Sequence, residues 1–175
     1  RNPVQNTEQE QTKQPLSPPQ REVADGILKG WREQDLRPVL IHGVTGSGKT
    51  QVYMELMEEV IRQGKQVILL IPEIALTYQT VMRFYARFGN RVSILNSRLS
   101  QGERSDQMER VRRGEVDVMI GPRSALFTPF SNLGLIVIDE EHEPTYKSEQ
   151  VPRYHARETA IRRAQIEQAS VVRGA

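Results

Sequence analysis

Short apolar runs recur along this chain, and between them apolar residues fall at the spacing of helices. Most of the runs are unbroken series of aliphatic residues, whereas a strand with one face in water alternates apolar with polar residues. Unbroken runs are typical of parallel strands that are covered on both faces. Six runs predict strands, at residues 39–42, 67–71, 92–95, 116–120, 135–138 and 170–172.

Two segments between these runs have helical patterns. Residues 50–63 place apolar side chains three and four positions apart and stop before Gly64, a residue type common just past a helix. Ser100 and Glu103 match a capping box, which predicts a charged helix that continues to Arg113. Strands alternating with helices indicate an α/β fold, a doubly wound and mainly parallel sheet flanked by helices.

The first 15 residues differ from the rest of the chain. They hold one aliphatic side chain, Val4, among glutamines and charged residues, too little apolar surface to offset the entropy of ordering. We therefore predict that residues 1–15 form a flexible arm or interdomain linker and that residues 16–175 form one domain.

Composition narrows the class of protein. A hydrophobic content of 37% with 26% charged residues is typical of a soluble globular chain. No apolar run approaches the roughly 20 residues that cross a bilayer, so we expect no membrane partner. The absence of cysteine excludes disulfides and thiolate metal sites within these residues and fits a reducing cytoplasm. The net charge of +2 is too small to identify a partner.

The most specific motif is GVTGSGKT, between the first predicted strand and the first predicted helix. It matches the phosphate-binding loop of P-loop NTPases at every fixed position. Its glycines let backbone N–H groups approach a polyphosphate, Lys49 would reach the β and γ phosphates, and the Thr50 hydroxyl would ligate Mg²⁺. We predict an ATP-Mg²⁺ site; a glycine-rich turn without a ligand is the alternative. The predicted nucleotide-binding residues are Gly43, Val44, Thr45, Gly46, Ser47, Gly48, Lys49 and Thr50.

An acidic cluster follows the fifth predicted strand, in LIVIDEEH. In P-loop NTPases a parallel strand near the phosphate loop ends in an aspartate that holds the same Mg²⁺, usually through water. Asp139 is the predicted Mg²⁺ partner and Glu140 the candidate general base, so Lys49, Asp139 and Glu140 are the candidate catalytic residues. Glu141 has no predicted role beyond local hydrogen bonding. Solvated acids at a strand end are the alternative.

The histidines do not favour a zinc site. His142, His155 and the neighbouring acids have no cysteine partner and no pair of histidines at helical spacing, so we predict no zinc in this segment. His142 is better interpreted as a hydrogen-bonding link between the hydrolysis site and a neighbouring segment. His42, flanked by apolar residues at a strand end, is expected to be structural.

Several segments combine aromatic or polar side chains with cations, as single-stranded nucleic-acid sites do. The clearest is TYKSEQVPRYHAR, residues 145–157, and GPRSALF and PEIALTYQ follow strand ends. Thr77 is also expected to cap the next helix, and Ile74 and Leu76 to lie in the core. The alternative is a solvated helix start, with Arg123 paired to a carboxylate. The predicted DNA contacts are Thr77, Arg123, Ser124, Tyr146, Lys147, Arg153 and Tyr154.

DEEH after an apolar strand, with GVTGSGKT upstream, resembles the first, RecA-like motor lobe of superfamily 2 helicases. The resemblance is closer to the PriA family of replication-restart helicases. It is carried by GVTGSGKTQVY, LLIPEIALTYQ, IGPRSALFTPF and LIVIDEEHEPTYKSEQVPRYHARETA, which span most of residues 38–160.

This resemblance implies an ATP-dependent DNA helicase that unwinds 3′ to 5′, acts on single-stranded and forked DNA and restarts stalled replication by primosome assembly. It implies primosome and single-strand-binding proteins as partners, and a bacterial, nucleoid-associated cytoplasmic location. LSPPQ resembles an entry segment in which Gln20 contacts adenine. His142 would lie on the coupling path, and the aromatic loop after DEEH would sense DNA and couple it to hydrolysis.

The chain departs from the family at its last residues, where SVVRGA stands and Gly174 and Ala175 are at most the stub of a segment that communicates between lobes. The second lobe with its arginine finger, a zinc module and an amino-terminal DNA-binding domain are expected elsewhere in a longer parent. Since an arginine finger contributes about 10³ to 10⁵ in rate, this lobe alone is expected to bind ATP-Mg²⁺ weakly, hydrolyse it barely and not unwind. Another P-loop ATPase, a DNA translocase without helicase activity and a non-enzymatic docking module are the alternatives.

Overall fold

The computed structural model describes residues 15–42, 47–139 and 150–174, without the side chains of residues 47 and 150–155. These residues build one parallel sheet of six strands in the order β1-β6-β5-β2-β4-β3. The predicted parallel α/β sheet is confirmed, and each predicted run overlaps a strand. The strands are β1 Val39–Ile41, β2 Gln66–Leu70, β3 Val92–Ile94, β4 Val118–Gly121, β5 Leu133–Asp139 and β6 Ser170–Gly174.

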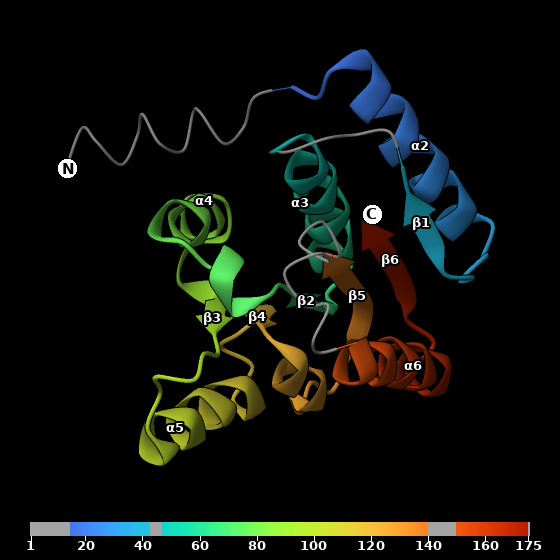
Figure 1. The fold of residues 1–175 in the computed structure, drawn as a ribbon. Coiled ribbons are helices and arrows are strands. Elements are labelled where there is room, and N and C mark those ends of the chain that lie inside the picture. Colours follow the sequence, from blue (N-terminus) through green and yellow to red (C-terminus); the bar gives the residue numbers. More distant parts are fainter. Residues whose placement is uncertain (1–14, 43–46, 140–149, 175) are drawn as a thin grey trace.

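Helices cover both faces of this sheet, α2, α3 and α4 on one and α5 and α6 on the other (Figure 1). Short 3₁₀ helices η1, η2 and η3 follow β2, α4 and β4. None of the described helices has both the length and the apolar character that crossing a bilayer requires. The helices are α2 Pro18–Arg32, α3 Ser47–Arg62, η1 Glu73–Ala75, α4 Tyr78–Phe88, η2 Gly89–Arg91, α5 Gln101–Arg112, η3 Arg123–Phe127 and α6 Gln150–Glu167.

Each face of the sheet has its own apolar core, and β5 supplies both. Leu135 and Val137 pack into the core under α2, α3 and α4, whereas Ile136 and Ile138 pack into the core under α5 and α6. Successive strand residues point to opposite faces, so a strand buried on both sides needs apolar residues at consecutive positions. This double burial is the physical reason for the unbroken runs in the sequence.

The helix ends follow local chemistry. Ser100 and Glu103 form the predicted capping box of α5. Thr77 caps α4 as predicted, because its Oγ1 accepts a hydrogen bond from the backbone N–H of Thr80 at 3.2 Å. Helix α3 begins at Ser47, earlier than the predicted residue 50, because the last residues of the phosphate-loop motif already form its first turn.

Three expectations about individual side chains need correction or refinement. Ile74 was expected in the core but is 64% exposed, because η1 turns it away from the sheet, whereas Leu76 packs against the core. Arg123 and Ser124 lie on the 3₁₀ helix η3 and not in an irregular loop. The side chain of His42 is exposed.

Candidate nucleotide site

The carboxyl ends of three parallel strands form the floor of the candidate site. Gly174 of β6 is in register with Ile41 of β1 on one side and with Asp139 of β5 on the other. The segment after β1 and the segment after β5 therefore leave the sheet at the same edge. One strand separates β1 from β5, which places them about 10 Å apart, twice the usual strand spacing. The predicted parallel relation of the two strands holds, with β6 between them.

Lys49 lies in the first turn of α3 and is only 2% exposed. A Cβ atom added at Gly174 would lie 3.3 Å from Cδ of Lys49, so the stem of this lysine passes against the end of β6. Burial takes an ammonium group out of water, and its charge must then be balanced by anionic or dipolar groups. The position at a helix N-terminus beside an acidic strand end is the one that a phosphate-binding lysine occupies.

Tyr53 links α3 to the acidic strand end. Its hydroxyl donates a hydrogen bond to Oδ1 of Asp139 at 3.4 Å, and its side chain is 1% exposed. Tyr53 follows Lys49 by four positions, so the two side chains lie one turn apart on the same face of the helix. Helix α3 thus brings Lys49 and Tyr53 to the end of β5, where Asp139 is half-buried.

Gly174 completes this cluster by leaving room for Tyr53. A Cβ atom at this position would lie 1.6 Å from Oη and 2.8 Å from Cζ of Tyr53. Both separations are far below a van der Waals contact, so any larger residue would displace the tyrosine or the strand. Lys49, Tyr53, Asp139 and Gly174 are called the strand-end cluster below.

Gln20 ties α2 to the first turn of α3. Its Nε2 donates to the carbonyl oxygen of Gly48 at 3.2 Å, and its Oε1 accepts from the backbone N–H of Ser17 at 2.8 Å. The same residue therefore closes the capping box of α2 and contacts the phosphate-loop helix. Its predicted contact with adenine stays a prediction. Thr50, the predicted Mg²⁺ ligand, is half-buried in the first turn of α3.

Three of the predicted DNA contacts, Thr77, Arg123 and Ser124, lie at the other half of the same sheet edge. Thr77 follows β2 and Arg123 follows β4, and these two strands are neighbours. Arg123 is exposed and forms no ion pair within the described ranges, so the alternative, a pairing of Arg123 with a carboxylate, is not seen there. The strand order thus separates the candidate nucleotide half, at β1, β6 and β5, from a half at β2, β4 and β3.

Two hydrogen bonds to a carboxylate join two loops in that second half. Glu73 in η1 accepts hydrogen bonds from the backbone N–H and the hydroxyl of Ser97, which follows β3. These bonds, helped by the charges of Arg98 and Arg104, hold the pKa of the Glu73 carboxyl below its usual value. The segments after β2 and β3 are therefore joined by side-chain chemistry as well as by the sheet.

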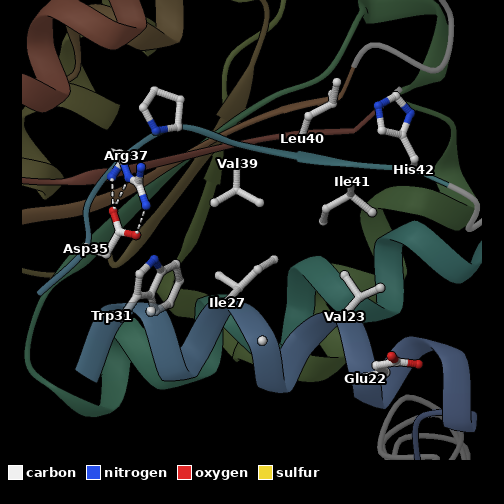
Figure 2. Close-up of a pocket in the computed structure, with 13 residues that line it drawn as sticks. Glu22, Val23, Ile27, Trp31, Asp35, Arg37, Val39, Leu40, Ile41 and His42 are labelled. Atoms are coloured by element: carbon white, nitrogen blue, oxygen red, sulfur yellow. Dashed lines mark hydrogen bonds and ion pairs between the residues drawn. The ribbon is translucent and has the colours of Figure 1, made fainter. Parts of the chain in front are cut away.

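A separate hollow of about 580 Å³ lies between α2 and β1 (Figure 2). Val23, Ile27 and Trp31 line it from α2, and residues of β1 line it from the sheet. At one end Asp35 and Arg37 form a bidentate ion pair at 2.8 and 2.9 Å, and this pair lowers the pKa of Asp35 to about 2. The hollow shares no lining residue with the strand-end cluster.

A family model described as DEAD/DEAH box helicase matches residues 17–171. The chain belongs to the DEAD/DEAH box helicase family. This membership agrees with the position of the first turn of α3 beside Asp139 at the end of β5.

Named relatives and a solved structure agree with this family. The chain is 48% identical over 160 residues to the Replication restart protein PriA of Bacillus subtilis, which covers 91% of this chain and 20% of the relative. It is 50% identical over 135 residues to the PriA protein of Haemophilus influenzae, covering 77% of this chain and 18% of the relative. The resemblance stated from the motifs is confirmed. The chain spans about a fifth of the length of these curated relatives.

The helicase fold is also seen in a solved structure of RecG bound to a three-way DNA junction. That structure is 20% identical, covers 98% of this chain and 22% of its own chain, and superimposes with a TM-score of 0.64. At this level of identity the similarity shows the fold alone.

Several of the predicted site residues lie outside the described residues. These are Gly43, Val44, Thr45, Gly46, Glu140, Glu141, His142, Tyr146 and Lys147. The side chains of Ser47, Arg153, Tyr154 and His155 are likewise not described. The backbone of residues 150–157, interpreted from sequence as part of a loop, belongs to helix α6.

Tyr53 is the residue of this site that sequence reasoning missed. Its helical spacing predicted a core residue, and it is indeed buried. The available signal was a hydroxyl on a buried aromatic ring one turn after Lys49, because a buried tyrosine usually finds a partner for its hydroxyl.

Proposed function

We propose that this chain is the ATP-binding lobe of an ATP-dependent DNA helicase. The observation that carries the proposal is the convergence of Lys49 and Asp139 at one sheet edge, beside the N-terminus of α3, in a chain of the DEAD/DEAH box family. A buried lysine, a helix N-terminus and a strand-end carboxylate are the groups that hold and polarise a nucleotide polyphosphate.

The donor chemistry fits Mg²⁺. The Thr50 hydroxyl and the Asp139 carboxylate are hard oxygen ligands, the kind that Mg²⁺ prefers, and each would act directly or through water. Bound Mg²⁺ would neutralise charge that develops on the β and γ phosphates. Lys49 would contact the same phosphates, Glu140 would orient and deprotonate the attacking water, and Gln20 would contact adenine. Zinc is not proposed for this segment.

On the DNA side, we propose that the second half of the sheet edge contacts the phosphate backbone. Arg123 offers an exposed cation, and Ser124 offers a hydroxyl. The N-terminus of α4, which Thr77 caps, offers backbone N–H dipoles. Tyr146 and Tyr154 would add aromatic platforms, with Lys147 and Arg153 as neighbouring cations and His142 on the coupling path.

The role of the longer parent is also a proposal, supported by similarity to proteins named for replication restart. We propose that the parent unwinds forked DNA with 3′ to 5′ polarity and reloads the replication machinery through primosome and single-strand-binding proteins in a bacterial, nucleoid-associated setting. A second motor lobe in cis would supply the arginine finger. This lobe alone would bind ATP-Mg²⁺ weakly, hydrolyse it slowly and not unwind DNA.

The decisive test is the ATPase rate of the full-length parent with and without forked DNA, in wild type, Glu140→Gln and Lys49→Ala. We expect forked DNA to raise the wild-type rate and both variants to lose at least about 100-fold, the effect typical of general base or phosphate contacts. Glu109→Gln and Lys29→Ala, on exposed positions of α5 and α2, are the matched controls.

Three outcomes would favour other functions. A wild-type rate that ignores DNA would favour a P-loop ATPase of another kind, and DNA-stimulated hydrolysis without strand separation would favour a translocase. Retained replication restart in Lys49→Ala would favour a non-enzymatic docking module.

A further inference from the structure

The strand-end cluster contains a tyrosine whose hydroxyl faces a charged partner. Tyr53 is buried among the apolar side chains of α3 and the sheet, yet its Oη donates to Oδ1 of Asp139 at 3.4 Å. A carboxylate at the end of a strand can adopt several rotamers, and each points its oxygens in a different direction. A hydrogen bond from a residue that cannot itself move restricts that choice.

Packing holds Tyr53 in place. Its side chain is 1% exposed, and Gly174 leaves space for its ring where a Cβ atom would lie 1.6 Å from Oη. Gly174 is paired in register with Asp139, the residue that Tyr53 contacts. The ring thus rests on the strand next to the one that carries its acceptor, and the hydroxyl is held at a fixed place relative to both.

We propose that Tyr53 is a positioning residue for the magnesium ion of the bound nucleotide, acting through Asp139. A carboxylate offers about four lone-pair positions, so a hydrogen bond from Tyr53 is compatible with Asp139 also contacting water molecules of hydrated Mg²⁺. Groups that hydrogen-bond to a metal-binding carboxylate orient it, and their loss lowers metal affinity. This inference rests on the proposed function and deepens it by adding a residue outside the phosphate-loop motif.

Tyr53→Phe separates positioning from packing, because it removes one hydroxyl and keeps the ring. We would measure equilibrium binding of a fluorescent ATP analogue to the full-length parent across a Mg²⁺ titration and in excess EDTA. Tyr85→Phe, a partly exposed tyrosine on α4, is the matched control. Urea unfolding of each variant would verify that it is folded.

In Tyr53→Phe we expect the Mg²⁺ concentration for half-maximal binding to rise about tenfold, the lower end of the range for such groups because the bond is long. Binding in EDTA should stay within about twofold of wild type, and Tyr85→Phe should match wild type in both conditions. Gly174→Ala should move the Mg²⁺ requirement in the same direction, because the added methyl group displaces the Tyr53 hydroxyl.

A Mg²⁺ requirement that does not change in Tyr53→Phe would overturn the inference. So would an equal loss of affinity with Mg²⁺ and in EDTA, which would mark Tyr53 as packing alone. If the wild-type parent bound the nucleotide without any dependence on Mg²⁺, the proposed function itself would fail, and that result is distinguishable because it concerns the wild type.

Discussion

The close approach of Gly174 to Tyr53 leads to a quantitative prediction for Gly174→Ala. The new Cβ atom would meet Oη of Tyr53 at 1.6 Å, its Cζ at 2.8 Å and Cδ of Lys49 at 3.3 Å. The tyrosine is buried, and β6 is paired on both sides, by β1 and β5, so neither partner can retreat without breaking packing or ladder hydrogen bonds. Overpacking of this kind costs about 1–3 kcal/mol.

An opposing effect is smaller. Gly174 does not have the positive φ of Gly64, Gly89 or Gly114, so alanine can adopt its backbone conformation. Alanine would then gain about 0.4–1 kcal/mol by restricting the unfolded chain. Steric overlap at a buried site is the larger effect, and we expect a net loss of about 1–2 kcal/mol in the free energy of unfolding.

Equilibrium unfolding of this chain in urea, followed by the fluorescence of Trp31, would measure the loss. The informative set is wild type, Gly174→Ala, Tyr53→Phe and the double variant. Because Tyr53→Phe removes the nearest atom, the alanine should cost less in the phenylalanine background, with part of the cost remaining from Cζ. Gly26→Ala in α2 is the control, since a Cβ there meets nothing within 4 Å, and it should stabilise by up to about 1 kcal/mol.

Two results would refute this reasoning. One is a Gly174→Ala protein that unfolds at the wild-type urea concentration. The other is a cost of alanine that is the same whether residue 53 is tyrosine or phenylalanine, because the steric overlap would then not be with the hydroxyl.

Three further predictions concern contacts away from the cluster. The Arg87 side chain is 6% exposed and donates to Glu58 through two hydrogen bonds of 2.6 and 2.8 Å, which raise the pKa of Arg87. Arg87→Leu should lower the free energy of unfolding in urea by about 1–3 kcal/mol, less than the loss of a fully buried pair, because Glu58 is 33% exposed. An unchanged urea midpoint would contradict this prediction. Ser100→Ala should lose about 1 kcal/mol with the cap of α5, whereas Ser105→Ala, exposed within the same helix, should not destabilise the chain. Because the pKa of Glu73 is lowered, its ionised form stabilises the fold above the ordinary pKa of 4.5, and this contribution disappears as the pH falls through the lowered pKa. The difference in urea midpoint between wild type and Glu73→Gln should therefore be present at pH 7 and shrink below about pH 4.5. A difference that does not change with pH would rule out a contribution from the ionised Glu73 carboxylate.

Much of the sheet was predictable because its physical cause is local. Strands buried on both faces must be apolar at successive positions, and this requirement is visible in runs such as residues 135–138. Helices α3 and α5 were predictable from apolar spacing and from a capping box. Helix α2 was not among the predicted elements, and of α4 only its start after Thr77 was expected. Gly26 and Gly30 obscure the pattern of α2, whose own capping box at Ser17 and Gln20 was available in the sequence.

The site was predictable in part, for a different reason. The phosphate-loop motif and the acidic box are short and local, so Lys49 and Asp139 are candidates from the sequence alone, and the structure brings both to the end of β6. The contact of Tyr53 with Asp139 joins residues 86 positions apart. Its existence depends on strand order, on the register of β5 with β6 and on the missing side chain at Gly174, none of which a single sequence displays.

The place of β5 between β6 and β2 has a mechanical consequence. On one side its last residue is paired with Gly174, and on the other Ile138 is paired with Leu70, so both ladders continue to the end of the strand. Sliding β5 along its neighbours would break hydrogen bonds on both sides at once, so we expect the strands of this sheet to move together as one rigid unit. A signal that passes between the proposed ATP half and the proposed DNA half must travel through the segments that leave the sheet, with the sheet as their common anchor.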